Sequence, residues 1–172
     1  VSLTFDDGPR AGITNRILDV LARKQTKATF FVCGRRLGQH SSLIRRIVSE
    51  GHELGNHTWS HPSLARLSLE EIGQQFDRTQ AAVNDALGSA YPMTYYRPPF
   101  GSPWFSKSPR RFEAQGRILE AVRARNGVLV LWQLGTGDTR KDATARSVLK
   151  TAKRTLRRRS GGIYCMHDTQ RH

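Results

Sequence analysis

Short apolar segments alternate with longer amphipathic segments along the chain. The short segments are rich in β-branched and aromatic residues, and turn-forming residues bound several of them. Such segments are typical of buried β-strands. The predicted strands are Val1–Phe5, Ala28–Val32, Glu53–Gly55, Thr94–Arg97, Val128–Trp132 and Gly162–Met166.

Between these strands, apolar residues recur three or four positions apart, which is the spacing of one helix face. The longest predicted helix runs from about Leu69 to Leu87. Further helices are predicted around Ile17, Ile44, Ile118 and Ala152.

A strand-helix series of this kind predicts an α/β fold with a mostly parallel sheet that can close into a barrel. The chain has 172 residues, no internal repeat and no low-complexity linker. We therefore expect one domain over residues 1–172. In such folds, reactive side chains lie at the carboxyl ends of the strands.

Polar residues follow the predicted strands in a repeated pattern. They are Asp6, Asp7, His57, His61, Arg97, Asp138 and His167. Scattered surface residues would not repeat this position, so we expect these side chains at one end of the sheet.

A metal site is the first chemistry that these residues suggest. His57 and His61 are four residues apart, and on a helical turn that spacing places two imidazoles on one face. Two histidines and one carboxylate are a common ligand set for a divalent ion, with positions left open for water and substrate. Asp7 is the best third ligand. A histidine pair alone is weak evidence, but an Asp-Asp turn in the same series strengthens it.

Asp6 and Asp7 are adjacent, and two carboxylates rarely share a buried strand end without a cation. The Asp-Gly-Pro sequence also suits an ordinary turn. In the functional interpretation, one carboxylate binds the ion and the other acts as general base on a bound water. His167 could protonate a leaving amine, although a structural histidine is the simpler interpretation of a lone residue.

The chain is strongly basic, with 28 Lys and Arg against 14 Asp and Glu and a net charge of +14. The densest run comprises Lys153, Arg154, Arg157, Arg158 and Arg159. Such a charge attracts anionic envelope polymers, anionic lipids or nucleic acid, whereas a solvated basic surface is the simpler explanation. No nucleic-acid-binding motif accompanies the run, so we expect no specific nucleic-acid partner. No apolar segment approaches the length of about 20 residues that a transmembrane helix needs.

The two cysteines, Cys33 and Cys165, lie in apolar strand-like segments without a metal-binding or disulfide framework spacing. Buried free thiols are favoured over a disulfide.

Four motifs resemble those of the polysaccharide deacetylase family, carbohydrate esterase family 4. They are Thr4–Pro9, His57–His61, Arg97–Gly101 and Ile163–Asp168, and their order and spacing match over nearly the whole chain. The resemblance implies a hydrolase that removes N-acetyl groups from chitin-like chains, peptidoglycan or other N-acetylglucosamine polymers.

The resemblance also implies a role for each site residue. Asp6 would be the catalytic base, and Arg97 would orient it. His167 would be the general acid, with Asp138 as its tuning partner. The backbone N–H of Phe100 would help to hold the oxyanion.

Asp7, His57 and His61 would bind one divalent ion, usually zinc and sometimes cobalt. The implied fold is a distorted (β/α) barrel. We expect it to lack its last helix and strand, because the chain ends five residues after His167. The chain opens on a predicted strand without an initiating methionine, so we expect a trimmed start and an extracellular, periplasmic or envelope location.

Three residues depart from the family pattern. Gly135 stands where the fourth motif has an aspartate, Thr139 where it has a tryptophan, and Cys165 where the last motif has a leucine. The last two positions border the acetyl pocket, so smaller residues there suggest room for a larger acyl group.

Three alternatives stay open beside an N-deacetylase. The first is a carbohydrate-binding member of the same fold with weakened catalysis. The second is a xylan O-acetyl esterase. The third is a basic protein that anchors to polyanions without hydrolysis.

Overall fold

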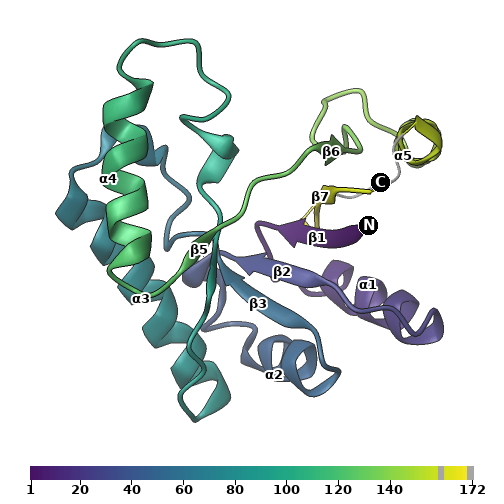
Figure 1. Cartoon of the computed structure of the whole chain (residues 1–172). Helices are drawn as coiled ribbons and strands as arrows, with labels where there is room; N and C mark the ends of the chain where they lie inside the picture. Colours follow the sequence, from purple (N-terminus) through teal and green to yellow (C-terminus); the bar gives the residue numbers. More distant parts are fainter. Residues whose placement is uncertain (159–160, 170–172) are drawn as a thin grey trace.

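Seven parallel strands form one curved sheet with helices on its outer side (Figure 1). This is the arrangement of residues 1–158 and 161–169, which the structure, a computed structural model, describes. The strands are β1 (Ser2–Asp6), β2 (Thr29–Val32), β3 (Glu53–Asn56), β4 (Tyr95–Tyr96), β5 (Val128–Leu129), β6 (Leu134–Gly135) and β7 (Ile163–His167). Their order across the sheet is β5-β4-β3-β2-β1-β7-β6.

Five α-helices connect these strands within the described residues. They are α1 (Ile13–Arg23), α2 (Ser41–Ser49), α3 (Leu69–Leu87), α4 (Arg111–Arg123) and α5 (Ala145–Arg158). The 3-10 helices η1 (Gly34–Arg36), η2 (Leu64–Arg66) and η3 (Pro99–Gly101) lie in the loops. The ends of α3 show why it is the longest helix. Ser68 and Glu71 form a reciprocal capping box at its start, and Gly88 ends it in the left-handed conformation.

The sheet curls without closing. Its two edge strands, β5 and β6, follow one another in the sequence, and β5 pairs with β4 whereas β6 pairs with β7. The segment 128–135 therefore reaches from one edge of the sheet to the other (Figure 1). The distorted barrel with mostly parallel strands that the sequence predicted is confirmed, as an open half-barrel.

The strand prediction for Val128–Trp132 was wrong in its extent. Only Val128 and Leu129 are in β5, and the unpredicted strand β6 follows at Leu134. The carbonyl oxygens of Val130 and Leu131 accept hydrogen bonds from the Arg97 side chain instead of extending a strand ladder.

Side chains alternate along each strand between an apolar outer face and a polar inner face of the sheet. On the outer face, Phe5 of β1 stacks on Phe30 of β2, with 5.2 Å between the ring centroids, and the core continues into Leu18 and Ile44 of the helices. The inner face is polar and includes Thr4, Asp6 and Arg97, all of them buried.

Gly55 leaves room for the ring of Phe31, which lies on this inner face. A Cβ added at Gly55 of β3 would lie 2.5 Å from the ring of Phe31, which in turn lies under the Arg97 guanidinium at 3.9 Å. Any larger residue at position 55 would displace this ring.

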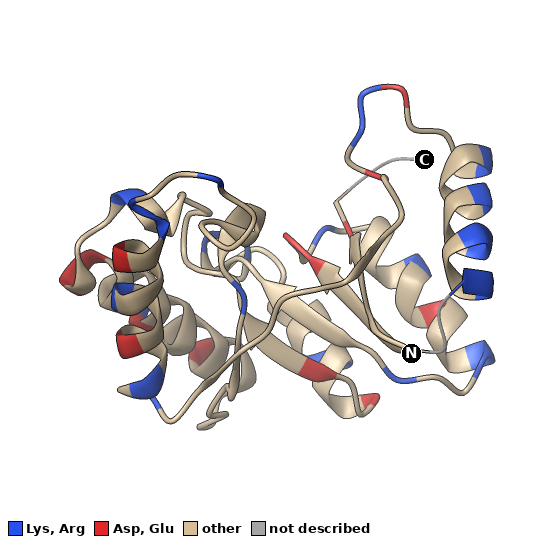
Figure 2. Cartoon of the chain, turned by 45° about the horizontal axis from the view of Figure 1, so that its top comes forward, with Lys and Arg blue, Asp and Glu red and all other residues tan. Residues whose placement is uncertain are grey.

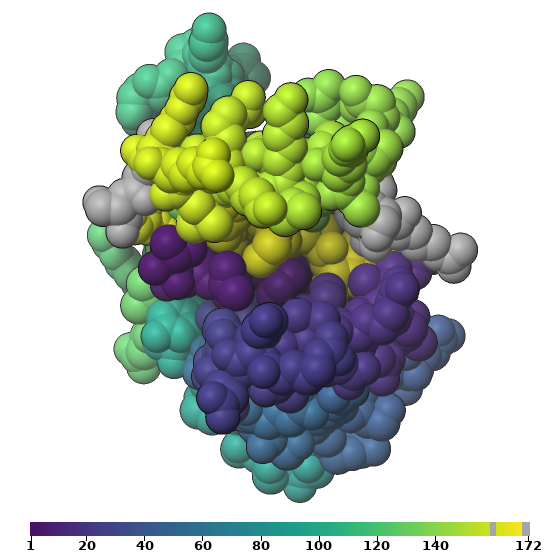
Figure 3. Space-filling model, turned by 90° about the vertical axis from the view of Figure 1, so that its right-hand side faces the viewer, coloured from purple at the N-terminus to yellow at the C-terminus, as the bar shows by residue number. Residues whose placement is uncertain are grey.

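Helix α5 lies on the side of the molecule next to β7 and α1 (Figure 3). None of its side chains is buried, and Ala152 of α5 accepts a hydrogen bond of 2.9 Å from the Tyr164 hydroxyl. Lys and Arg residues recur along this helix (Figure 2). Arg159, the last residue of the predicted basic run, lies outside the described residues. No helix in the described part of the chain has the length and apolar content needed to cross a membrane.

Asn56, at the end of β3, joins the sheet to α3 and to the loop after β3. Its side chain is fully buried, donates to the carbonyl of Phe76 at 2.9 Å and accepts from the backbone N–H of Thr58 at 3.0 Å. We predict that Asn56→Ala lowers the free energy of unfolding by about 1–3 kcal/mol, because two buried backbone groups lose their partner.

Denaturant unfolding followed by circular dichroism measures this loss. The matched control is Gln74→Ala on the exposed face of α3, which should change stability by less than about 0.5 kcal/mol. Equal losses in the two variants would contradict the prediction.

Candidate active site and metal centre

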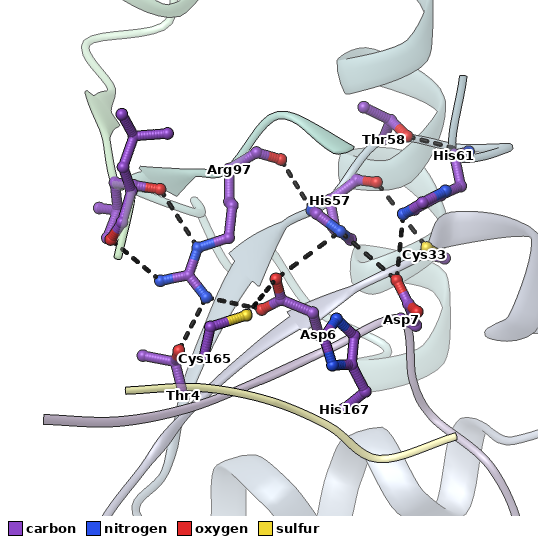
Figure 4. A network of polar contacts seen from close by, with 12 residues as sticks. Thr4, Asp6, Asp7, Cys33, His57, Thr58, His61, Arg97, Cys165 and His167 are labelled. Atoms are coloured by element: carbon purple, nitrogen blue, oxygen red, sulfur yellow. Dashed lines mark hydrogen bonds and ion pairs between the residues drawn. The ribbon is translucent and has the colours of Figure 1, made fainter. Parts of the chain in front are cut away.

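The carboxyl ends of four strands, β4, β3, β1 and β7, bring the polar residues together (Figure 4). Asp6 ends β1, His57 follows β3, Arg97 follows β4 and His167 ends β7. In the parallel register, Asp6 of β1 lies opposite His167 of β7. The structure thus places the predicted residues at one end of the half-barrel.

Asp7, His57 and His61 form a cluster whose ligand atoms lie within 4.8 Å of one another. The Asp7 Oδ1 atom is 3.1 Å from His61 Nε2 and 3.5 Å from His57 Nε2. Bonds of about 2.0–2.2 Å from one ion would separate such ligands by about 3.0–3.5 Å.

Orientation of the imidazoles supports the same fit. His57 Nδ1 lies 2.7 Å from the carbonyl oxygen of Arg97 and donates its proton there. Neutral His57 then presents a lone pair on Nε2 to a carboxylate oxygen, and two acceptors at this distance need a cation or proton between them. Asp7 Oδ1 is buried and lacks a conventional hydrogen bond in the described chain. These residues therefore fit a divalent metal ion.

The surroundings of Asp7 favour its ionised form, which is the form that binds a metal ion. Burial by itself raises the pKa of the Asp7 carboxyl, but the adjacent imidazoles of His57 and His61 outweigh burial and hold that pKa far below its usual range. Asp7 is therefore ionised at neutral pH, as a metal ligand must be.

The helical turn expected for His57 and His61 was wrong. The segment between them is an irregular loop in which Thr58 and His61 have positive φ angles of 70° and 63°. Side chains hold this loop in place of a helical ladder. Thr58 Oγ1 accepts from the His61 backbone N–H at 3.0 Å, and Gln75 accepts from that of Ser60 at 2.9 Å.

Arg97 is the central buried cation of the site. Its guanidinium donates to Asp6 Oδ1 and to Thr4 Oγ1, both at 2.7 Å, and its own exposure is 0%. This leaves Asp6 Oδ2 facing the rest of the cluster, 3.8 Å from His57 Nε2. Asp6 thus has one oxygen held by a cation and one turned toward the metal ligands.

His167 and Asp138 form the second charged pair. Asp138 Oδ2 accepts from the His167 backbone N–H at 2.7 Å, and Nδ1 of the ring lies 3.1 Å from Oδ1. Burial by itself lowers the pKa of His167, but Asp138 outweighs burial and raises that pKa above the ordinary 6.5. Burial raises the pKa of Asp138, and the contacts with His167 bring it below its ordinary value.

Phe100 lies beside the metal cluster on η3. Its backbone has a positive φ of 62°, its side chain is exposed, and its ring centroid is 4.7 Å from that of His61. The Phe100 ring therefore lies against the predicted ligand His61.

Two residues next to the site, Asp168 and Cys165, make contacts that the sequence did not predict. Asp168 is fully buried, which raises its pKa to about 7, and its Oδ2 accepts from Thr14 Oγ1 at 2.6 Å. A Cβ added at Gly8 would meet the Asp168 carboxylate at 2.0 Å, so Asp168 supports the turn that carries Asp7. The Cys165 thiol donates to Asp6 Oδ2 at 3.4 Å. Both cysteines are buried free thiols.

The altered fourth motif lies at an open position. Gly135 is exposed on β6, and a Cβ added there would meet nothing within 4 Å. Thr139 is exposed in the following loop. A larger side chain at position 135 would therefore displace no neighbour.

Comparisons with known proteins agree with this arrangement. A family profile described as "Polysaccharide deacetylase" matches residues 1–115. The peptidoglycan-N-acetylglucosamine deacetylase PgdA of Listeria monocytogenes is 45% identical over 102 residues, which are 59% of this chain and 22% of that protein. A chitooligosaccharide deacetylase of Bradyrhizobium is 37% identical, with 85% of this chain and 77% of that protein covered.

Among solved structures, the peptidoglycan deacetylase PdaC of Bacillus subtilis superposes with a TM-score of 0.78 at 32% identity. The match covers 99% of this chain and 75% of that structure. The chain thus spans only about a fifth of the Listeria protein but most of the Bradyrhizobium one. The sequence match and the shared fold lead to one conclusion: the chain belongs to the polysaccharide deacetylase family, carbohydrate esterase family 4.

Proposed function

We propose that this chain is a metal-dependent hydrolase that removes N-acetyl groups from N-acetylglucosamine-containing polysaccharides or oligosaccharides, of the chitin or peptidoglycan type. The convergence of Asp7, His57 and His61 beside the Asp6–Arg97 pair carries the proposal. Relatives named as deacetylases of peptidoglycan and of chitooligosaccharides support the substrate class.

In this proposal Asp7, His57 and His61 hold the cation. Two imidazoles and a carboxylate suit Zn²⁺ best, and Co²⁺ or another divalent ion can replace it. When bound, the cation would lower the pKa of a water molecule and polarise the acyl carbonyl.

Asp6 is the proposed general base. Arg97 holds Oδ1 by a buried ion pair, so the carboxylate keeps a fixed direction while Oδ2 accepts the proton of the attacking water. Phe100 would contribute its backbone N–H to the developing oxyanion.

His167 is the proposed general acid. Nδ1 faces Asp138, so Nε2 is the ring nitrogen that can give a proton to the leaving amine. Asp138 stabilises the charged ring and so favours the protonated form that a general acid needs.

The altered fourth motif concerns the size of the acyl group that the enzyme can accept. We propose that the smaller residues Thr139 and Cys165 leave room for N-acyl groups larger than acetyl. Comparing hydrolysis of N-acetyl and N-propionyl chitooligosaccharides tests this, and a strict preference for acetyl would contradict it.

The remaining alternatives differ in what they release. A xylan O-acetyl esterase would release acetate from acetylated xylan faster than from chitooligosaccharides. A carbohydrate-binding member with weakened catalysis would bind the glycan and release acetate from neither. We propose one catalytic domain over residues 1–172 and an extracellular, periplasmic or envelope location, where such polymers lie.

We also propose that the outer face of α5 attracts anionic polymers. Arg146, Lys150, Lys153, Arg154, Arg157 and Arg158 line this face, and the helix contains no acidic residue. No salt bridge to these cations occurs within the described residues, so their charge is available to a phosphate or carboxylate polymer.

Substituting the two adjacent aspartates should separate metal binding from chemistry. Asp7→Ala should lose the bound metal and acetate release together, because it removes a ligand. Loaded with one equivalent of metal, Asp6→Asn should keep that metal and lose about 10²–10⁴-fold in rate, because it removes the base and no ligand of the first site. Elemental analysis and acetate release from chitooligosaccharides measure the two effects.

The exposed Asp85→Asn on α3 is the control, and it should change neither quantity. A chelator should abolish activity in the unsubstituted protein, and added Zn²⁺ or Co²⁺ should restore it. If Asp6→Asn lost the metal and Asp7→Ala kept it, the two assigned roles would be wrong.

The pH profile should depend on Asp138. A general acid works when protonated, so the rate should fall as pH rises through the raised pKa of His167. Asp138→Asn removes the main cause of the raised pKa. The alkaline limb of the kcat profile should therefore move to lower pH.

Asp142→Asn is the matched control, because Asp142 lies in the same loop but pairs with the exposed Arg140. Its alkaline limb should coincide with that of the unsubstituted protein. An unmoved limb in Asp138→Asn would exclude His167 as an acid tuned by this carboxylate.

The outer face of α5 should set the strength of polyanion binding. Charge reversal at Lys150, Arg154 and Arg157 should lower the salt concentration that elutes the protein from an immobilised phosphodiester polymer, because exposed cations bind polyanions through their local density.

Reversal of Lys24, Arg66 and Lys107 changes the net charge equally at exposed positions away from α5. This control should elute at clearly higher salt than the α5 variant. Identical elution would mean that net charge alone governs binding.

A further inference from the structure

A second set of possible metal ligands lies next to the first. Asp6, Cys165 and His167 place one ligand atom each within 4.8 Å of the others. Cys165 and His167 both come from β7, and Figure 4 shows them beside the Asp6 carboxylate. The proposed deacetylation gives the thiol group of Cys165 no chemical step.

The distances suit an ion that binds thiolate. Cys165 Sγ lies 3.4 Å from Asp6 Oδ2. An ion bonded to sulfur at about 2.3 Å and to oxygen or nitrogen at about 2.1 Å would hold these ligands about 3.3–3.7 Å apart. One pair already meets this requirement, and the remaining separations need side-chain adjustments of about 1 Å.

Neighbouring residues fix the direction of two of these ligands. Arg97 holds Asp6 Oδ1 at 2.7 Å, so Oδ2 is the oxygen that faces Cys165. Asp138 contacts Nδ1 of His167, which leaves Nε2 for a ligand. A carboxylate behind an imidazole is the usual support of a histidine that binds metal.

We propose that Asp6, Cys165 and His167 bind a second, thiophilic divalent cation, such as Zn²⁺ or Cd²⁺, which inhibits the enzyme. Binding breaks the S–H bond of Cys165, releases the proton to solvent and forms a sulfur–metal bond. The thiolate favours zinc and softer ions over magnesium or calcium.

Inhibition follows from the identity of the ligands. The same cation takes Oδ2 from the proposed base Asp6 and Nε2 from the proposed acid His167. Binding of the second cation does not depend on the proposed function, whereas its inhibitory effect does.

Metal titration tests the binding directly. The full chain is stripped with a chelator and titrated with Co²⁺, with bound metal counted by elemental analysis and thiolate-to-cobalt charge transfer followed by near-ultraviolet absorption. The unsubstituted protein should bind two equivalents, and the second should produce the absorption band. Cys165→Ala should bind one equivalent without the band.

Two further variants make the result specific. Cys33→Ala removes the other buried thiol and should keep both equivalents and the band. Cys165→Ser keeps a small hydrogen-bonding side chain beside Asp6 and should also lose the band, which separates ligation from a packing effect. A single equivalent in the unsubstituted protein, or a band that survives in Cys165→Ala, would overturn the proposal.

Kinetics test the inhibitory effect. The rate of acetate release should rise with the first equivalent of Zn²⁺ and fall with the second. In Cys165→Ala, relative to its own maximal rate, the inhibitory Zn²⁺ concentration should increase about 100-fold, since even loss of a ligand's supporting partner costs about 10–100-fold. Equal inhibition of the two proteins would show that this site does not inhibit. If no loading releases acetate, the proposed function fails, and the cobalt titration still decides the second site.

Discussion

The buried ion pair between Arg97 and Asp6 is the interaction on which the rest of the site depends. Taking a guanidinium and a carboxylate out of water costs several kcal/mol for each charge. The attraction between the two charges offsets this cost only when their remaining donors and lone pairs are also hydrogen-bonded. Here the guanidinium donates to Asp6, to Thr4 and to two carbonyl groups of the segment between β5 and β6, and it lies against the ring of Phe31. One side chain thus fastens β1, β2, β4 and the edge-to-edge segment to each other.

The same residue links the proposed base to the metal ligands. The Arg97 side chain orients Asp6, and its backbone carbonyl accepts the Nδ1 proton of His57. The tautomer of a proposed ligand and the direction of the proposed base are therefore both set by one position on the chain. A small shift at the end of β4 would disturb the two together, which explains why Arg97 is enclosed completely.

Sequence patterns predicted the parts of the molecule that depend on local periodicity. The alternation of apolar runs and amphipathic helices predicted the parallel sheet, and the polar residues after the strands predicted where Asp6, His57 and His167 would meet. The loop from His57 to His61 was mispredicted as a helical turn, because residue spacing does not reveal that Asn56 and Thr58 side chains would hold an irregular backbone. The contact between Cys165 and Asp6 depends on the register of β1 and β7, 159 residues apart in sequence, which periodicity alone cannot supply.

The segment that runs from β5 to β6 joins the two edges of the sheet and so limits how far apart these edges can lie. Because these two strands lie at opposite edges of the sheet, the residues between them act as a strap whose length sets how tightly the sheet can curl. Asp138 follows this strap and contacts His167. A change in the length of this one connection would therefore alter both the curl of the sheet and the position of Asp138 relative to the proposed metal ligands.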